Sequence, residues 1–320
     1  MNKKILITGC AGFIGSNLVD FLLKKKLTVI GIDNLSTGNL KNLNKALKNK
    51  NFKFFKSDLI NKNKIKKYFK NIDTVYHFAA NADVRNGINQ PKKDLEQNTI
   101  VTFNVLEAMR ENEVKKIIFS STGSIYGETT QIPTPENANF PIQTSLYGAS
   151  KLACEGLIQA YCDHYNFQSW IFRFVSILGK RYSHGHVFDF YKKLLKNPKK
   201  LDVLGNGNQK KSYLNIKDCL SAIMIAIRSS NKKINIYNLG TNEFSRVRDS
   251  VKWITKHLLL KPMVKYQNNK RGWPGDIPNI YLDTKKIRKL GWKPVYTIED
   301  SIIETLNFLK ENKWLLKRKK

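Results

Sequence analysis

The sequence predicts an α/β fold with a doubly wound parallel sheet, because compact apolar runs alternate with amphipathic segments of helical length. The apolar runs lack the polar/apolar alternation of a half-exposed strand, which is typical of strands buried on both faces. The segments between them place apolar residues at helical spacing. The predicted strands are KILIT, TVIGID, FKFFKSD, DTVYHFAA, KKIIFSS and SWIFRFV, and the predicted helices include FIGSNLVDFLLKKK, NKNKIKKYFKN and NTIVTFNVLEAMRENE.

The rhythm of the chain changes after about residue 176, where loops rich in glycine and asparagine appear, such as VLGNGNQKKSY. Helical segments continue, among them IKDCLSAIMIAIRSS and TIEDSIIETLNFLKEN, so this half predicts a smaller α/β lobe rather than a disordered tail. We therefore expect a larger domain at residues 1–175 and a substrate-binding lobe at residues 176–320, with segments that interleave near the boundary.

The 320 residues carry a formal net charge of +31, which raises the question of an anionic partner. The excess lies in lysines interleaved with asparagines, and no recognition helix, zinc-finger spacing or basic-aromatic motif accompanies it. We therefore expect no specific nucleic-acid partner. The terminal LLKRKK is compatible with weak attraction to an anionic membrane surface.

Cysteine usage and hydropathy indicate the compartment. Four cysteines without a C-x-x-C pair predict reduced thiols, and hence a cytoplasmic protein. No apolar stretch reaches the ~18 residues of a membrane span. The short apolar run near the N-terminus is broken at once by glycines, which is poor for a signal peptide.

Three glycines, Gly9, Gly12 and Gly15, lie between the first predicted strand and the first predicted helix. Backbone amides and a helix N-terminus suited to a pyrophosphate meet there, and a Cβ would block its close approach. Asp33 ends the second predicted strand, where a carboxylate accepts hydrogen bonds from ribose hydroxyls and repels a 2′-phosphate. The sequence therefore predicts NAD rather than NADP, with a turn or capping role for Asp33 as the alternative. Asp58 either binds the adenine amino group or caps the next helix.

Tyr147 and Lys151 stand four residues apart in YGASK, on one face of a predicted helix. The spacing suits a tyrosine base tuned by a lysine, but it also fits a core aromatic beside a surface cation. A useful base near neutral pH needs the tyrosine pKa to fall by about three units from ~10, or ~4 kcal/mol. One cation ~4 Å away at an effective dielectric of ~20 supplies about that much, so we expect Lys151 to lower the pKa of Tyr147.

The glycine loop, HFAA, FSSTGSIYG and YGASK occur in this order, and the combination is more specific than any single motif. On these motifs the chain resembles the extended short-chain dehydrogenase/reductase family, in its NAD-dependent epimerase/dehydratase group, and within it the nucleotide-sugar epimerases. The resemblance implies a Rossmann domain, NAD as cofactor, and epimerisation at C4 of a UDP-hexose through a 4-keto intermediate. It also implies a homodimer that pairs through the helix after HFAA and the helix that carries Tyr147.

The family pattern implies a role for each matched residue. Thr122, Tyr147 and Lys151 form the catalytic trio, in which Thr122 orients the reacting hydroxyl, Tyr147 is the base and Lys151 also holds the nicotinamide ribose. Thr122 as a strand-end turn residue and Asn98 as a helix cap remain the alternatives. The predicted NAD-binding residues are Gly9, Gly12, Phe13, Ile14, Gly15, Asp33, Asn34, Asp58, Leu59, Phe78, Ala79, Ala80, Asn98, Ser120, Tyr147 and Lys151, and the predicted substrate-binding residues are Val84, Thr122, Tyr147, Ser176, Lys211 and Arg271.

Three of the substrate positions depart from the family pattern. Ser176, in RFVS, replaces an asparagine that contacts the sugar nucleotide in relatives, and Lys211 replaces a phosphate-binding arginine. A lysine neutralises phosphate only as a point charge, without the bidentate fork of arginine. Arg271 is a second candidate phosphate clamp, farther from Gly275 and Asp276 than the usual arginine. These departures leave the identity of the sugar open.

Other activities of the same family are the nearest alternatives. Dehydratases place Asp-Glu after the threonine and decarboxylases keep a glutamate there, whereas this chain has Gly123 and Ser124, so the acid for elimination is missing. Reduction of a keto sugar uses the same trio and stays open, as does a catalytically silent NAD-binding regulator. His184 and His186 lack a nearby cysteine or carboxylate cluster, so we expect loop polar groups or substrate contacts rather than a metal site.

Overall fold

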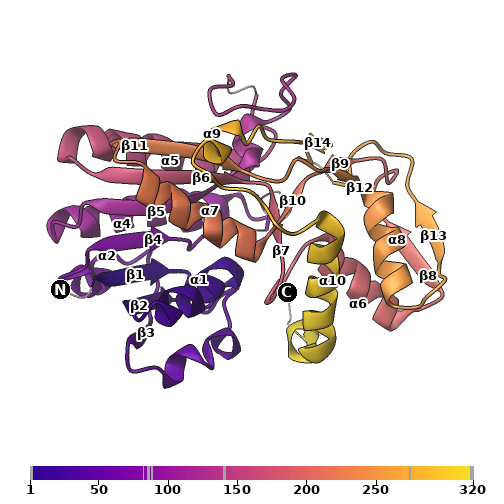
Figure 1. Ribbon diagram of the computed structural model, residues 1–320, viewed down its shortest axis with the longest axis horizontal. Coiled ribbons are helices and arrows are strands. Elements are labelled where there is room, and N and C mark those ends of the chain that lie inside the picture. The colour runs from indigo at the N-terminus through magenta and orange to yellow at the C-terminus, as the bar shows by residue number, and fades with distance from the viewer. Residues whose placement is uncertain are drawn as a thin grey trace. The chain divides into compact units, whose positions relative to one another are not determined.

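The computed structural model describes residues 3–81, 83, 84, 87, 89–139, 142–273 and 275–317. The chain divides into two compact units, which Figure 1 shows as ribbons. Unit 1 comprises Met1–Ile125, Ser145–Arg173 and Ala226–Tyr237, and unit 2 comprises Tyr126–Thr144, Phe174–Ile225 and Asn238–Lys320. This division differs from a single boundary after residue 175, because one early segment belongs to unit 2 and one late segment belongs to unit 1.

Unit 1 is built on a seven-stranded sheet in the order β11-β6-β5-β4-β1-β2-β3, which runs from top to bottom in Figure 1. The pairs β1–β2, β2–β3, β1–β4 and β4–β5 are all parallel, so the predicted doubly wound α/β fold is confirmed. The predicted bounds of the first two strands are also correct. The strands are β1 (Lys4–Thr8), β2 (Thr28–Asp33), β3 (Phe52–Lys56), β4 (Thr74–His77), β5 (Lys116–Thr122), β6 (Gln168–Phe174) and β11 (Ile234–Leu239).

The sheet reverses its winding at β1, which pairs with β2 on one side and with β4 on the other. Ligands of open α/β sheets bind beyond the carboxyl ends of the strands at such a reversal. Thr8, Asp33 and His77 end these three strands, and Thr122 ends β5. The fold therefore brings the predicted cofactor residues to one edge of the sheet.

The helices of unit 1 bury their apolar sides against the sheet. Leu18 of α1, Val105 of α4 and Ile158 of α5 are fully buried, as are Leu6 and Ile32 of the strands. The helix predicted from residue 98 differs in its first part, because residues 95–100 form a π-helix that continues into α4. The helices are α1 (Phe13–Lys24), α2 (Lys62–Ile65), α3 (Pro91–Asp94), the π-helix η5 (Leu95–Ile100), α4 (Val101–Glu111) and α5 (Leu146–Tyr165).

Unit 2 contains three small groups of strands, β10 with β7, β12-β9-β14 and β13 with β8. This agrees with the predicted smaller α/β lobe. Helix α7 (Ile216–Ser229) begins in unit 2 and ends in unit 1. The other elements are β7 (Ser176–Leu178), β8 (Lys200–Val203), β9 (Lys210–Lys211), β10 (Tyr213–Asn215), β12 (Ser245–Arg246), β13 (Met263–Tyr266), β14 (Asn279–Ile280), α6 (His186–Lys196), α8 (Val247–His257), α9 (Lys285–Arg288) and α10 (Ile298–Glu311).

Helix lengths and thiols bear on two further expectations. Over the described ranges, no helix is both long enough and apolar enough to cross a bilayer. All four cysteines are buried and unpaired: Cys10, Cys154, Cys162 and Cys219.

Candidate functional site

The glycine loop of unit 1 tolerates no side chain at two of its three glycines. Gly9 has φ +69°, and a Cβ there would lie 2.7 Å from the backbone nitrogen of Ala79. A Cβ on Gly15 would lie 2.2 Å from the carbonyl oxygen of Gly9. Gly12 caps the twelve-residue helix α1 without a side-chain hydrogen bond, so the N-terminus of the helix lies directly at the glycine loop. This cradle fits a pyrophosphate at the helix N-terminus.

Asp33 organises the same loop from the end of β2. Its carboxylate accepts hydrogen bonds from the backbone nitrogen of Ala11 at 2.9 Å and from that of Leu35 at 2.8 Å. The side chain is 8% exposed, and a Cβ on Gly38 would lie 2.6 Å from its Oδ1 atom. The turn role expected as an alternative for Asp33 is therefore present, at the place where the ribose role is also predicted.

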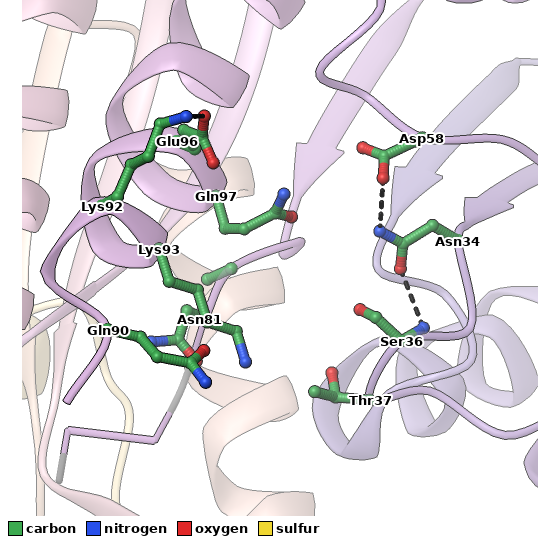
Figure 2. A pocket seen from close by; sticks show the side chains of 11 residues that line it. Asn34, Ser36, Thr37, Asp58, Asn81, Gln90, Lys92, Lys93, Glu96 and Gln97 are labelled. Atoms are coloured by element: carbon green, nitrogen blue, oxygen red, sulfur yellow. Dashed lines mark hydrogen bonds and ion pairs between the residues drawn. The ribbon is translucent and has the colours of Figure 1, made fainter. Parts of the chain in front are cut away.

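A cavity of about 390 Å³ opens beside Asp33 in unit 1, and Figure 2 shows its lining. Asn34 links its neighbours on one side of the cavity, because its Nδ2 donates to Oδ2 of Asp58 at 3.0 Å and its Oδ1 accepts from the nitrogen of Ser36 at 3.0 Å. Ala80 also lines the cavity. Asp58 does not cap the next helix, since Asn61 provides the N-cap of α2. The cavity is a polar space of suitable size for the adenosine part of a dinucleotide.

The predicted catalytic trio gathers at the carboxyl end of β5. Thr122 is the last residue of that strand, and its hydroxyl lies close enough to the phenol of Tyr147 to act on the pKa of that phenol. The Thr122 hydroxyl also accepts from the nitrogen of Ser124 at 3.1 Å, so the turn role and the site role coexist. Lys151 is 2% exposed and donates from Nζ to the carbonyl oxygen of Ser120 at 2.8 Å. The Ser145 side chain caps the N-terminus of α5 and so fixes where the helix that carries Tyr147 and Lys151 begins.

The expected effect of Lys151 on Tyr147 is wrong for the protein alone. Burial raises the pKa of Tyr147 to about 12, although the hydrogen bond from Thr122 acts in the opposite direction. Lys151 is itself disfavoured as a cation, because burial lowers its pKa to about 8.

Residues 77–79 and Thr8 complete the edge of the sheet where the cofactor is predicted to bind. The nitrogens of Phe78 and Ala79 donate to the Thr8 backbone oxygen at 3.2 Å and to its hydroxyl at 3.3 Å. His77 is fully buried between the hydroxyls of Thr8 at 2.7 Å and Thr102 at 3.0 Å, and burial lowers its pKa to about 3. His77 is therefore a neutral residue of the core and takes no part in proton transfer.

Asn98 lies inside the π-helix, so the alternative that it caps a helix is wrong. Its Nδ2 donates to the Ser150 hydroxyl at 2.8 Å, and its Oδ1 accepts from the nitrogen of Asn81 at 2.8 Å. The sequence analysis did not identify Asn81, Asp94 or Ser150, which share this buried network. The available signal was the polar pair Asp94 and Asn98, four residues apart in an amphipathic helix.

Other predicted NAD-binding residues occupy the places that their motifs imply. Phe13 and Ile14 begin α1 directly after the glycine loop. Leu59 is 5% exposed, and its carbonyl oxygen accepts from Nδ2 of Asn104 at 3.0 Å. Val84 is half-buried in a turn of unit 1.

In unit 2, the two predicted phosphate-binding cations are paired with carboxylates. Lys211 donates from Nζ to Oδ1 of Asp276 at 2.7 Å and to the carbonyl oxygen of Ile277. Arg271 pairs with Glu128 at 2.5 Å, and both side chains of that pair are about half exposed. Ser176 is exposed at the start of β7.

The two histidines of SHGH differ in their surroundings. His186 is the first residue of α6 rather than a loop residue, packs against the ring of Tyr213 with centroids 4.7 Å apart, and has a pKa lowered to about 3 by burial. His184 is exposed and stacks on Tyr182 with centroids 6.0 Å apart. Among the described residues, no three His, Cys, Asp or Glu side chains gather to hold a metal ion.

Comparisons with known proteins agree with this geometry. A putative UDP-glucose 4-epimerase of Methanocaldococcus jannaschii is 35% identical over 96% of this chain and 99% of its own length. A crystal structure of a UDP-galactose 4-epimerase covers 97% of this chain and all of its own, with a TM-score of 0.88 and 32% identity. The UDP-glucuronic acid 4-epimerase of Bacillus cereus, in complex with UDP-glucuronic acid and NAD, covers 96% of this chain and 99% of its own with a TM-score of 0.87 and 28% identity. Residues 5–240 match the model of one family, and the chain belongs to it: the NAD dependent epimerase/dehydratase family.

Proposed function

We propose that the protein epimerises a UDP-hexose at C4, with NAD as its cofactor. The observation that carries the proposal is the grouping of the Thr122 hydroxyl and the Tyr147 phenol at the end of β5, where the buried Lys151 donates to the Ser120 carbonyl oxygen at 2.8 Å. A hydroxyl, a phenol and a cation at the carboxyl end of β5 suit the removal of a proton from a sugar hydroxyl. The relatives named above are epimerases of UDP-sugars, which supports the same reaction for this chain.

The residues divide the work of the reaction. Bound NAD would supply the acceptor, and afterwards the donor, of a hydride at the sugar carbon. Thr122 orients the reacting hydroxyl, and Tyr147 takes its proton. Since burial holds the pKa of Tyr147 high, its deprotonation depends on nearby positive charge, which Lys151 supplies in its protonated form. Burial of Thr122 and Lys151 limits the access of water and strengthens these interactions.

Epimerisation is favoured over dehydration by the two residues after Thr122. Elimination of water needs an acid at that place, but Gly123 carries no side chain and Ser124 carries a hydroxyl. The Ser124 hydroxyl accepts a hydrogen bond from Thr122 at 3.2 Å, so it supports the orienting residue. A carboxyl group is absent from both positions.

For the substrate diphosphate, we propose Lys211 and Arg271 as ligands. The Arg271–Glu128 pair is half exposed, and such pairs contribute little, so exchange of the carboxylate for a phosphate costs little. Lys211 lies deeper, with 12% of its side chain exposed, and its charge is shared with Asp276. Val84 and Ser176 are proposed to contact the sugar nucleotide.

We also propose that the protein pairs with a second copy of itself. Large apolar side chains on η5, α4 and α5 are exposed, which is costly in an isolated subunit. They are Leu95, Ile100, Phe103, Leu146 and Tyr165. The hydrodynamic mass of the purified protein tests this proposal.

The substrate proposal is tested by incubating the purified protein with UDP-glucose, UDP-N-acetylglucosamine and UDP-glucuronate, and separating the products by chromatography. We expect a C4 epimer from at least one of them. Tyr147→Phe should abolish its formation, whereas Tyr165→Phe, on the exposed end of the same helix, should not. A product that has lost water or carbon dioxide would contradict the assignment, as would full activity of Tyr147→Phe.

A further inference from the structure

A buried carboxyl of unit 1, on Asp94, has an unbalanced environment. Asp94 ends α3 and is 1% exposed. Its Oδ1 accepts from Nδ2 of Asn81 at 2.8 Å and from Nδ2 of Asn98 at 3.4 Å. Its Oδ2 is buried and has no hydrogen-bond partner among the residues that the structure describes. Unsatisfied buried oxygens are costly, so the residue calls for an explanation beyond stability.

The Oδ2 atom of Asp94 lies against Gly87. A Cβ on Gly87 would lie 2.5 Å from it, so the backbone of that glycine covers it. Any function of the carboxyl therefore depends on Oδ1, which accepts hydrogen bonds from two side-chain amides.

Those amides lead to the catalytic helix by a continuous path. The second hydrogen of the Asn98 amide goes to the Ser150 hydroxyl at 2.8 Å, and that hydroxyl donates to the carbonyl oxygen of Tyr147 at 2.9 Å. Asn98 also accepts from the nitrogen of Asn81 at 2.8 Å. All of these groups except the Tyr147 side chain are nine-tenths or more buried. A network of this kind fixes one arrangement when its amides are satisfied.

The π-helix η5 provides the backbone for part of this hydrogen-bonded path. Asp94 immediately precedes η5, and Asn98 lies within it. A π-helical turn inserts an extra residue per turn and is frequent at functional sites. In this chain the π-helical turn is associated with the inward direction of the Asn98 side chain. In a regular α-helix, each added residue turns the side-chain direction by about 100°.

We propose that Asp94 is a positioning residue of the redox site: its Oδ1 atom orients the amides of Asn81 and Asn98, and through Ser150 it holds the first turn of α5 that carries Tyr147. The proposal rests on the proposed function, because it gives Tyr147 a catalytic role. It goes beyond the catalytic trio by adding a carboxyl that touches neither substrate nor cofactor.

The charge of Asp94 provides a second readout. It raises the pKa values of both Tyr147 and Lys151. Among the described residues, the charged groups that act on Asp94 itself are Lys93, Asp83 and Lys151, while burial raises its own pKa and the hydrogen bond from Asn81 lowers it. Around Tyr147, Thr122 lowers the pKa, and Cys154 raises it. Removing the Asp94 charge therefore shifts the titration of Tyr147 to lower pH.

Two substitutions separate positioning from charge. Asp94→Asn keeps an oxygen that accepts hydrogen bonds from the amides of Asn81 and Asn98. Its new NH₂ group replaces only Oδ2. Asp94→Leu removes the acceptor as well. We expect kcat of Asp94→Asn to stay within ~3-fold of wild type with its pH midpoint moved lower, and kcat of Asp94→Leu to fall ~10-fold or more with little change in KM.

A double-mutant cycle tests the path through Ser150. Ser150→Ala should lower kcat by itself, and its combination with Asp94→Leu should lower kcat by less than the product of the two single effects. If Asp94→Leu does not fold, the isosteric Asp94→Asn still tests the proposal. Multiplicative effects in the cycle, equal losses in both Asp94 variants, or an unmoved pH midpoint in Asp94→Asn would each overturn it.

The proposed function and this inference can be tested independently of each other. Ring-labelled tyrosine gives an NMR titration of Tyr147 without any substrate, with the signal identified by its absence in Tyr147→Phe. If no sugar nucleotide is turned over, the proposed function fails, while the expected shift of that titration in Asp94→Asn still stands or falls by itself.

Discussion

Lys151 donates from its buried ammonium group to the carbonyl oxygen of Ser120 at 2.8 Å, and the same group lies 4.6 Å from the centre of the Phe119 ring. The carbonyl oxygen and the Phe119 ring both favour the cation, as do the negative charges of Glu155 and Asp94. This compensation is incomplete, because burial still lowers the pKa of Lys151 to about 8. The protein therefore keeps a costly charge at its proposed catalytic centre.

The first prediction concerns that cost. The folded-state pKa of Lys151 lies below the ordinary 10.5, so the unfolded chain binds more protons between about pH 8 and 10.5. Stability from this group is then lowest below pH 8 and rises as the pH increases through that window. Lys151→Met should raise the free energy of unfolding of the cofactor-free protein at pH 7 by on the order of 1–3 kcal/mol and abolish activity.

Denaturant unfolding at pH 7 and pH 10 measures this effect. The exposed Lys116→Met is the matched control, for which we expect no change beyond ~0.5 kcal/mol. A Lys151→Met protein that is less stable than wild type at pH 7 would show that the Ser120 bond outweighs the burial.

The second prediction concerns the glycine loop. Gly15→Ala places a Cβ 2.2 Å from the Gly9 oxygen, so the loop must shift, and we expect NAD binding to weaken at least ~10-fold. Gly156→Ala is the control, because no atom lies within 4 Å of its Cβ in the exposed middle of α5. That change should stabilise the protein by ~0.5–1 kcal/mol. Calorimetric titration with NAD compares the two variants, and equal NAD affinity in both would contradict the cradle.

Part of the site could be predicted from the sequence, and part of it could not. The glycine spacing and Asp33 were predictable, since the loop between a strand and a helix leaves few residue types with the needed backbone freedom. The trio was found through the order of its motifs. Its electrostatics was not, because the pKa of Tyr147 depends on burial and on where the Lys151 ammonium points, and neither is encoded by a four-residue spacing.

The Asp94 network was missed for a related reason. Asp94 and Asn98 have the spacing of any exposed polar pair on a helix, and only the π-helical turn brings them inward to Asn81 and Ser150. The partners of Lys211 and Arg271 were hidden too, because Asp276 is 65 residues from Lys211 in the chain and Glu128 lies in a different segment from Arg271.

The third prediction concerns the buried ion pair between Arg173 and Glu155. Arg173 Nη2 lies 2.8 Å from Glu155 Oε2, both side chains are at most 2% exposed, and the Ser121 hydroxyl donates to the same carboxylate. Glu155→Leu leaves a buried guanidinium without its carboxylate and should cost ~3–5 kcal/mol of unfolding free energy. The double variant Glu155→Leu with Arg173→Leu should be more stable than that single variant, as measured by denaturant unfolding. A double variant less stable than both single variants would contradict this prediction, because the two losses would then accumulate as for independent side chains.

The fourth prediction concerns the substrate phosphate. Arg271→Ala should raise KM for the sugar nucleotide ~10-fold with kcat nearly unchanged, because a lost charge-assisted hydrogen bond to the diphosphate affects ground state and transition state alike. Lys270→Ala, at the exposed neighbouring position, is the control and should leave KM unchanged. Steady-state kinetics of both variants decides, and an unchanged KM in Arg271→Ala would remove this residue from the phosphate site.

The most direct test of the proposed epimerisation follows the hydrogen at C4. The purified protein is incubated with UDP-glucose, or with whichever UDP-hexose it accepts, in D₂O, and the product is examined by NMR and mass spectrometry. Because the hydride returns to the carbon it left, the account predicts a C4 epimer of unchanged mass with no deuterium on carbon, and no product with Tyr147→Phe. Deuterium on a sugar carbon, or a product lacking water, would contradict it.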